Sequence, residues 1–337
     1  MSSDLQIQYN APWHDLKHVC VGTTYCPEFY EPVKNSQVRD VLQRISSETI
    51  EDYSNLAKVL LDLGVQVDQL TLDPDRTIMD YVDSRGNIDY AQSQSFTLIP
   101  RPPMQPRDSV LVVDHQVVLT NSESSWFTEL YPNYPVIKSP VLFDAPLVTV
   151  IGDTLIADCR DHPELEQFLT RTFPDHNIVP VMIGGHNDAV FSVMAPGVIV
   201  STYHHTNYTE TFPGWQVKFI DNQSWNAVPE WRAFKHSNRD RWWTPDSKNN
   251  PEFSNFVNTW LNNWVGFVGE TVFDINMLQI NQHCVLVNNY NKELFEFLIK
   301  HKIEPIVVPF RHRFFWDGGL HCITNDLNRH GPNDCYF

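Results

Sequence analysis

The sequence predicts an α/β protein in which about five units, each with the order strand, strand, helix, strand, close into a ring. A pair of short apolar strands around a polar turn occurs four times along the chain. The two chain ends hold the parts of one more unit, so we expect them to meet. With 42% hydrophobic residues among 337, the chain has enough apolar material for a large core.

The four repeated strand pairs are runs of valine, isoleucine and leucine that are interrupted by turn residues such as Gly152-Asp153 and Pro196-Gly197. They predict hairpins over residues 109–120, 147–157, 190–201 and 275–287.

A helix and a further strand follow two of these hairpins. Residues 292–302 carry a helical apolar face, and residues 306–310 form the next strand. In the same way, residues 162–173 predict a helix and residues 178–183 a strand. These segments complete two of the expected units.

The first unit lacks a local partner strand. Residues 19–21 predict a strand, residues 37–63 a long amphipathic helix that ends at Gly64, and residues 65–70 a second strand. The final apolar segment, residues 320–327, supplies the missing partner and closes the ring.

A closed ring of repeats is one domain, so we expect residues 1–337 to form a single catalytic domain. The segment 213–251 differs from the rest because its tryptophans lie among polar residues without a clear period. We interpret it as an irregular insertion over one face, which is typical of a lid or binding loop. Its tryptophans are Trp215, Trp225, Trp231, Trp242 and Trp243.

Charge and composition exclude several classes of function. The formal charge of −17, from 24 basic and 41 acidic residues, argues against nucleic acid as a partner. No apolar run reaches the roughly 18 to 20 residues of a membrane span, and the start lacks the features of a secretion signal. The six cysteines have no framework spacing, which fits reduced thiols. We therefore expect a cytoplasmic protein that needs no metal and no cofactor.

Chemically active side chains stand directly before the hairpins and at the ring closure. If the first strand of each unit lines the axis, these side chains converge at one mouth of the ring. A cysteine, a histidine and an aspartate together indicate nucleophilic catalysis, and further carboxylates indicate a cationic substrate. In chain order they are Asp108, Asp144, His186, Asp188, Glu270 or Asp274, and Cys322.

Each of these residues also has an ordinary structural explanation. Aspartates before strands are commonly turn or cap residues, and His186 beside Gly184-Gly185 fits a loop. A lone cysteine is usually a small buried hydrophobe. The glycine-rich polar stretch at residues 317–321 nevertheless favours a backbone near a ligand, and with it a nucleophilic Cys322.

Four segments resemble those of the L-arginine:glycine and L-arginine:inosamine-phosphate amidinotransferases. Residues 318–329 resemble the family's nucleophile segment, with Gly-Gly, His-Cys, Thr, Asp and Arg in register. Residues 186–201 resemble its histidine segment, a His-x-Asp-Ala motif followed by a Pro-Gly turn. Residues 106–113 resemble its first guanidinium-binding strand, and residues 143–145 the segment of its triad aspartate. The four occur in the family's order over most of the chain.

The resemblance implies the pentein fold, a five-bladed α/β propeller with pseudo-fivefold symmetry, which agrees with the repeat count. It implies that Cys322 is the nucleophile, His186 the acid/base and Asp144 its orienting partner. Asp108 and Asp188 would hold the guanidinium of the donor.

The implied reaction is the transfer of an amidino group from a small guanidino donor, arginine or a relative of it, to an amine acceptor. It passes through a covalent amidino-cysteine, and His186 protonates the leaving amine and then deprotonates the acceptor. Water in place of the acceptor would make the protein a hydrolase. A homo-oligomer is compatible with this function.

The chain differs from the family at the positions that recognise the carboxylate and the amino group of the donor. The arginine that holds the donor carboxylate in the family falls on His205, and the paired serines that hold the amino group fall on Gly269 and Glu270. We expect weak discrimination for the α-amino-acid end of arginine, or a donor other than arginine. In the second case Glu270 would suit a second positive charge on the donor. Arginines of the insertion are possible replacements, namely Arg232, Arg239 and Arg241.

Three alternatives stay open. The nearest is a guanidino hydrolase or deiminase of the same superfamily, although the extended Gly-Gly-Leu-His-Cys segment favours the transferases. Another is a protein that binds a guanidinium or a polyamine without turnover. The third is a metal-dependent hydrolase that uses His186, Asp188, His204 and His205.

Overall fold

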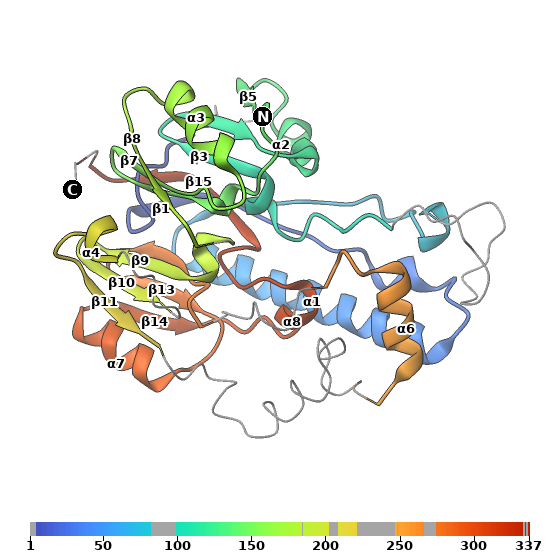
Figure 1. Ribbon diagram of the computed structural model, residues 1–337. Coiled ribbons are helices and arrows are strands. Elements are labelled where there is room, and N and C mark those ends of the chain that lie inside the picture. Colours follow the sequence, from blue (N-terminus) through green and yellow to red (C-terminus); the bar gives the residue numbers. More distant parts are fainter. Residues whose placement is uncertain are drawn as a thin grey trace.

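The computed structural model describes residues 5–81, 99–183, 185–201, 208–220, 247, 249–265, 274–332, 334 and 336–337. Within these residues the strands form five small sheets of three strands each (Figure 1). None of the helices in these ranges is long and apolar enough to cross a membrane.

The strands fall into three sets by their place in a sheet. The first strands are β3 (Val110–Val113), β6 (Val148–Ile151), β9 (Phe191–Ala195), β12 (Leu278–Asn281) and β15 (Thr324–His330). The middle strands are β4 (Gln116–Leu119), β7 (Thr154–Asp158), β10 (Val198–Ser201), β13 (Cys284–Val287) and β1 (Asp15–Val21). The third strands are β5 (Val136–Lys138), β8 (Asn177–Val181), β11 (Gln216–Phe219), β14 (Glu304–Val307) and β2 (Gln66–Gln69).

All five sheets share one topology, in which the middle strand is antiparallel to the first strand and parallel to the third. Four sheets use consecutive strands. The fifth has the order β15-β1-β2 and joins the two ends of the chain. The four hairpins and the ring-closing pairing predicted from the sequence are therefore confirmed.

One helix connects the middle strand to the third strand in each unit. These helices are α1 (Ser36–Asp62), α2 (Ser125–Leu130), α3 (Pro163–Thr172), α4 (Tyr208–Thr211) and α7 (Lys292–Lys300). A connection of this length is what a parallel pair of strands requires. Each unit thus has the predicted order of strand, strand, helix and strand.

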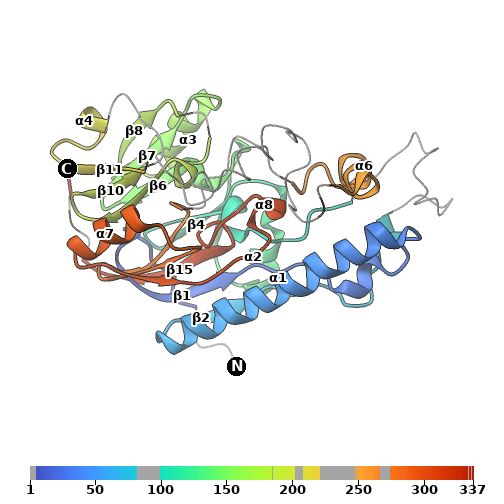
Figure 2. The same ribbon diagram turned by 90° about the horizontal axis from the view of Figure 1, so that it is seen from below.

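The first helix, α1, is much longer than its counterparts. The side chain of Asn35 caps its start by accepting a hydrogen bond from the backbone N of Gln37 at 3.0 Å. Its end is set by Gly64, whose φ of 80° lies in the left-handed region. Figure 2 shows that α1 runs beside β1 and β2 and continues toward α6 (Pro251–Trp260).

Burial decreases from the first and middle strands to the third strands. All four residues of β3 and all five of β7 are buried, whereas no residue of β2, β11 or β14 is. This gradient puts the third strands at the periphery. The short third strands therefore form the more exposed of the two edges of each sheet.

Both chain ends pack across the turns of the hairpins. The backbone of Tyr9 pairs with that of Asp114, in the β3–β4 turn, and the N–H of Gly152, in the β6–β7 turn, donates to the carbonyl of Asn10. A Cβ atom on Gly152 would lie 2.1 Å from the backbone oxygen of Asp334, so only glycine fits there. The chain ends therefore lie over the β3–β4 and β6–β7 turns, and the opposite end of the ring carries the starts of the first strands.

The structure corrects one part of the predicted insertion over 213–251. Residues 216–219 form β11 and pair with β10, because Val217 and Phe219 pack against the apolar core beneath that sheet. Pro251 begins α6. Residues 221–246 and 248, which hold most of the insertion, lie outside the described residues.

Candidate active site

The polar residues that precede the first strands come together at the open end of the ring. Asp108 lies in the short 3-10 helix η3 (Pro106–Ser109), and Asp144 precedes η5 (Ala145–Leu147). His186 precedes η6 (Asn187–Ala189), which contains Asp188. The helix η5 contacts both η3 and η6, and η3 also contacts β15, which follows Cys322. Five predicted residues from four blades therefore form one cluster.

His186 and Asp144 are hydrogen-bonded to each other. The Nε2 atom of His186 lies 3.2 Å from Oδ2 of Asp144, and both side chains are partly exposed, at 29% and 52%. The amide of Asn121 donates to Oδ1 of Asp144 and to the backbone carbonyl of Asp108, each at 3.2 Å. Asn121 therefore ties the carboxylate that orients His186 to the neighbouring blade.

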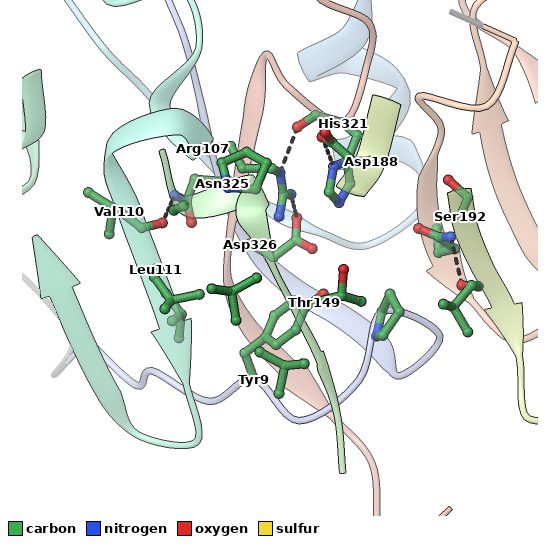
Figure 3. A pocket seen from close by; sticks show the side chains of 18 of the residues that line it. Tyr9, Arg107, Val110, Leu111, Thr149, Asp188, Ser192, His321, Asn325 and Asp326 are labelled. Carbon is green, nitrogen blue, oxygen red and sulfur yellow. Dashed lines mark hydrogen bonds and ion pairs between the residues drawn. The ribbon is translucent and has the colours of Figure 1, made fainter. Parts of the chain in front are cut away.

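Cys322 is buried between an amide and a carboxylate. Its Sγ atom lies 3.0 Å from Nδ2 of Asn276 and 3.6 Å from Oδ2 of Asp188, and 6% of the residue is exposed. The same Asp188 oxygen lies 2.6 Å from Nδ1 of His321. Figure 3 shows His321 and Asp188 directed toward each other.

Arg107 anchors the segment that carries the cysteine. Its Nε atom donates to the carbonyl of His321 at 2.7 Å, and a terminal nitrogen donates to Asp326 at 2.8 Å (Figure 3). Asp326 also pairs with Arg329 at 2.8 Å. Burial acts to raise the pKa of Asp326, but the two arginines outweigh it and hold this pKa far below its usual range.

Two carboxylate oxygens of the cluster have no partner among the described residues. Oδ1 of Asp108 and Oδ1 of Asp188 are both buried and accept no hydrogen bond from that part of the chain. Burying a carboxylate oxygen without a donor is unfavourable, so such atoms are suited to a ligand that brings N–H groups and positive charge.

The two carboxylates differ in charge state. Burial raises the pKa of Asp108 to about 7, with smaller contributions from Asp144 and Asp188, against the opposing charges of His186 and Arg101. Burial also acts to raise the pKa of Asp188, but the hydrogen bond and charge of His321 prevail and lower it to about 2. Asp188 is therefore an anion at neutral pH. Asp108 changes its charge near neutral pH, because its pKa is about 7.

The thiol and the imidazole are both protonated in the unliganded site. Burial raises the pKa of Cys322 well above its usual range, and the carboxylates of Asp188 and Asp108 raise it further. Burial acts to lower the pKa of His186, but the hydrogen bond of Asp144 and the charges of Asp108 and Asp188 raise it to about 10. At neutral pH the cluster therefore pairs a neutral thiol with an imidazolium.

A cavity on the ring axis adjoins this cluster without including its thiol. Residues of β3, β6 and β9 line it, together with Tyr9, Arg107, Gln279 and Asp326. Asp188 and His321 also line it (Figure 3), whereas Cys322 and His186 do not. The cavity therefore reaches the pair of Asp188 and His321 but is distinct from the site around Cys322.

Sequence reasoning missed Asn276, Asn121 and the pairing of His321 with Asp188. Asn276 stands just before β12, at the position where three other blades carry Asp108, Asp144 and Asp188, and that position is the signal in the sequence. An amide does not titrate, so the residue type alone gives no indication of a chemical role. Asp274, an alternative for this blade, instead accepts hydrogen bonds from Asn289 at 2.5 Å and Asn291 at 3.1 Å.

Several predicted residues lie outside the described residues. These are His204, His205, Gly269, Glu270, Arg232, Arg239 and Arg241. Within the described part of the chain, no group of three or more histidine, cysteine, aspartate or glutamate side chains is arranged to hold a metal ion.

The sequence matches no protein-family model and no curated protein. Solved structures match the fold over nearly the whole chain. The inosamine-phosphate amidinotransferase StrB1 from Streptomyces griseus has 16% identity and a TM-score of 0.67, covering 98% of this chain and 99% of that chain. SxtG, an amidinotransferase from Microseira wollei in the saxitoxin biosynthetic pathway, has 15% identity and a TM-score of 0.68, with the same coverage of 98% and 99%.

A dimethylarginine dimethylaminohydrolase has 13% identity and a TM-score of 0.55, covering 92% of this chain and 98% of that chain. The likeness thus extends to proteins with different reactions. Together with the five sheets of common topology, these matches identify the fold of this chain as the pentein fold, a five-bladed α/β propeller.

Proposed function

We propose that this protein is an amidinotransferase that moves the amidino group of arginine, or of a related guanidine, to an amine acceptor. The observation that carries the proposal is the pair of buried oxygens, Oδ1 of Asp108 and Oδ1 of Asp188, that accept no hydrogen bond from the described residues, in the cluster where Asp188 also contacts the thiol of Cys322. A guanidinium is a planar cation with paired N–H groups, which match two carboxylates in geometry and in charge.

Binding of the cation activates the nucleophile in this proposal. The charges of Asp188 and Asp108 raise the pKa of Cys322, so a guanidinium that pairs with them cancels much of their effect. The thiol then releases its proton to solvent, and the thiolate faces the guanidino carbon. The free thiol stays protonated and unreactive until a donor is bound.

The transfer has two halves that balance. The thiolate attacks the guanidino carbon, the bond from that carbon to the leaving nitrogen breaks, and His186 gives its proton to the leaving amine. A cationic amidino-cysteine and a neutral imidazole remain. The acceptor amine then gives a proton to His186 and attacks the same carbon, which restores the thiolate and the imidazolium.

Asp144 orients the imidazole for both steps. Its hydrogen bond and charge keep His186 protonated before the leaving group departs, because they raise the pKa of His186 to about 10. The arrangement of cysteine, histidine and aspartate argues against a protein that only binds guanidines or polyamines. We further propose that residues 1–337 act as one catalytic domain.

A guanidino hydrolase is the second candidate, since a dimethylarginine dimethylaminohydrolase shares this fold. The two functions differ in which nitrogen leaves the guanidino carbon and in what attacks the covalent intermediate. In the transferase the donor's amine leaves and a second amine attacks, whereas in a hydrolase water attacks. Urea then forms if the donor's amine has left, and citrulline forms if ammonia has left. We expect ornithine to form from arginine only when an amine is present, with the amidino group recovered on that amine. Formation of urea or citrulline from arginine alone would favour the hydrolase instead.

A further inference from the structure

The side chain of Asn276 contacts the nucleophile on both its backbone and its sulfur. Its Oδ1 atom accepts hydrogen bonds from the backbone N–H groups of His321 and Cys322, each at 3.1 Å. Its Nδ2 atom lies 3.0 Å from Sγ of Cys322. Asn276 is 2% exposed, so these contacts are shielded from water.

The surrounding backbone fixes the orientation of this amide. A rotated amide would direct its NH₂ group at two N–H donors and would leave both of them unpaired. The nitrogen of Asn276 therefore faces the sulfur. The residue that follows the second strand of the same hairpin holds Asn276 in place, since the amide of Asn288 donates to the carbonyl of Asn276 at 3.1 Å.

The glycine pair before the cysteine allows this close approach. A Cβ atom on Gly319 would lie 2.7 Å from Oδ1 and 2.9 Å from Cβ of Asn276. Any larger residue at position 319 would therefore push the amide away from the loop. The glycine-rich segment and Asn276 fit together as one unit.

We propose that Asn276 is a positioning residue for the nucleophile: its oxygen holds the loop of Cys322, and its N–H group donates to the sulfur and favours the thiolate. The inference rests on the proposed role of Cys322 and adds a second means of activation to donor binding. A hydrogen bond to an anion is stronger than one to a neutral acceptor, so the contact at 3.0 Å gains strength as the thiol ionises.

Competition for the amide hydrogens makes this contact responsive to the donor. Nδ2 of Asn276 lies 3.2 Å from Oδ2 and 3.4 Å from the carbonyl oxygen of Asp188, as well as near the sulfur. Two hydrogens thus face three acceptors. A guanidinium that satisfies the carboxylate of Asp188 leaves more of the donor capacity of Asn276 for the thiolate.

The substitution Asn276→Asp separates the two parts of this role. Aspartate has the same shape and keeps an oxygen for the two backbone N–H groups, but it directs a carboxylate oxygen at the sulfur. We expect the rate at which iodoacetamide alkylates Cys322, followed by mass spectrometry of its peptide at fixed pH, to fall at least about tenfold. One pKa unit changes the thiolate fraction tenfold below the pKa.

Asn276→Ser provides a second variant if the aspartate does not fold, because the shorter side chain does not reach the sulfur. Asn325→Ala is the matched control. Asn325 is also 2% exposed, and its side-chain amide donates to the carbonyls of Pro106 and Val110, at 3.2 and 2.8 Å, and not to the sulfur of Cys322. We expect it to lower the thermal midpoint of unfolding yet to keep the alkylation rate within about threefold of wild type.

The alkylation assay needs no amidinotransferase activity, so the two proposals fail separately. Slower alkylation in the Asn276 variants without any amidino transfer by the wild type would support the positioning role and remove the proposed function. If a folded Asn276 variant is alkylated as fast as the wild type, the inference about Asn276 is wrong, whatever reaction the wild type catalyses.

Discussion

The Oδ2 atom of Asp188 lies 3.6 Å from Sγ of Cys322, although 134 positions separate the two residues. The fold creates this proximity because each residue precedes a first strand, and the first strands meet at the ring axis. Burial raises the pKa of the Cys322 thiol, and the same carboxylate raises it further, while its Oδ1 atom, which accepts no hydrogen bond from the described residues, is available to a cation. Binding and activation are thus coupled through one side chain.

The unusual titration of Asp108 gives a prediction about pH. Because the pKa of Asp108 is about 7, the second carboxylate, beside that of Asp188, is available to the donor only above that pH. We expect the KM for the donor to rise as the pH falls through 7 in the wild type. In Asp108→Asn the KM should be higher at pH 8, by about tenfold or more, and should lose this pH dependence. Steady-state kinetics from pH 6 to 9 measures both effects.

The same carboxylate should destabilise the folded protein. The pKa of Asp108 is about 7 in the folded protein and near the ordinary value of about 4 in the unfolded chain, so the unfolded chain loses this proton at a lower pH. The free energy of unfolding therefore falls as the pH rises from about 4 to about 7. We expect Asp108→Asn to raise the melting temperature at pH 8 but not at pH 4. Equal shifts at the two pH values would contradict the raised pKa.

The pair of His186 and Asp144 predicts a shift in a histidine titration. The hydrogen bond and charge of Asp144 oppose the burial that would otherwise lower the pKa of His186. In Asp144→Asn the pKa of His186, followed by NMR of labelled histidine, should fall from about 10 by at least about one unit. Turnover at alkaline pH should fall with it, since the leaving amine then lacks its proton donor. An unchanged titration would remove Asp144 from this role.

Arg101 gives a prediction about the donor. Its charge lowers the pKa of Asp108 and Asp144, and its Nε atom is buried without a partner among the described residues. We expect it to contact the carboxylate of an amino-acid donor. Arginine should then be preferred over agmatine, and Arg101→Gln should reduce that preference by about ten- to a hundredfold.

The comparison of arginine with agmatine also tests the departures in the sequence. If His205 replaces a family arginine, the preference in the wild type should stay below about a thousandfold, because a histidine is a conditional cation. A larger preference that survives in Arg101→Gln would assign carboxylate recognition to another cation, such as Arg232, Arg239 or Arg241. Single variants of these three arginines would separate the possibilities.

The sequence was sufficient to predict the ring, because each blade repeats one apolar pattern and the two chain ends complement each other. It also indicated which titratable residues converge, since all of them precede a first strand. It did not reveal Asn276 or the pairing of His321 with Asp188, because these roles depend on distances across the axis. The sequence did not predict β11 at the start of the insertion, because this strand is short and only partly buried.

The central claim is that Cys322 attacks the guanidino carbon, and the most direct test is mass spectrometry of enzyme quenched during turnover of arginine. We expect an amidino adduct on the peptide that holds Cys322, and its decay when an amine is added. Cys322→Ala should lack both adduct and turnover while it melts within a few degrees of wild type, since the substitution removes only one small buried atom. An adduct on another cysteine, or full activity in Cys322→Ala, would contradict the claim.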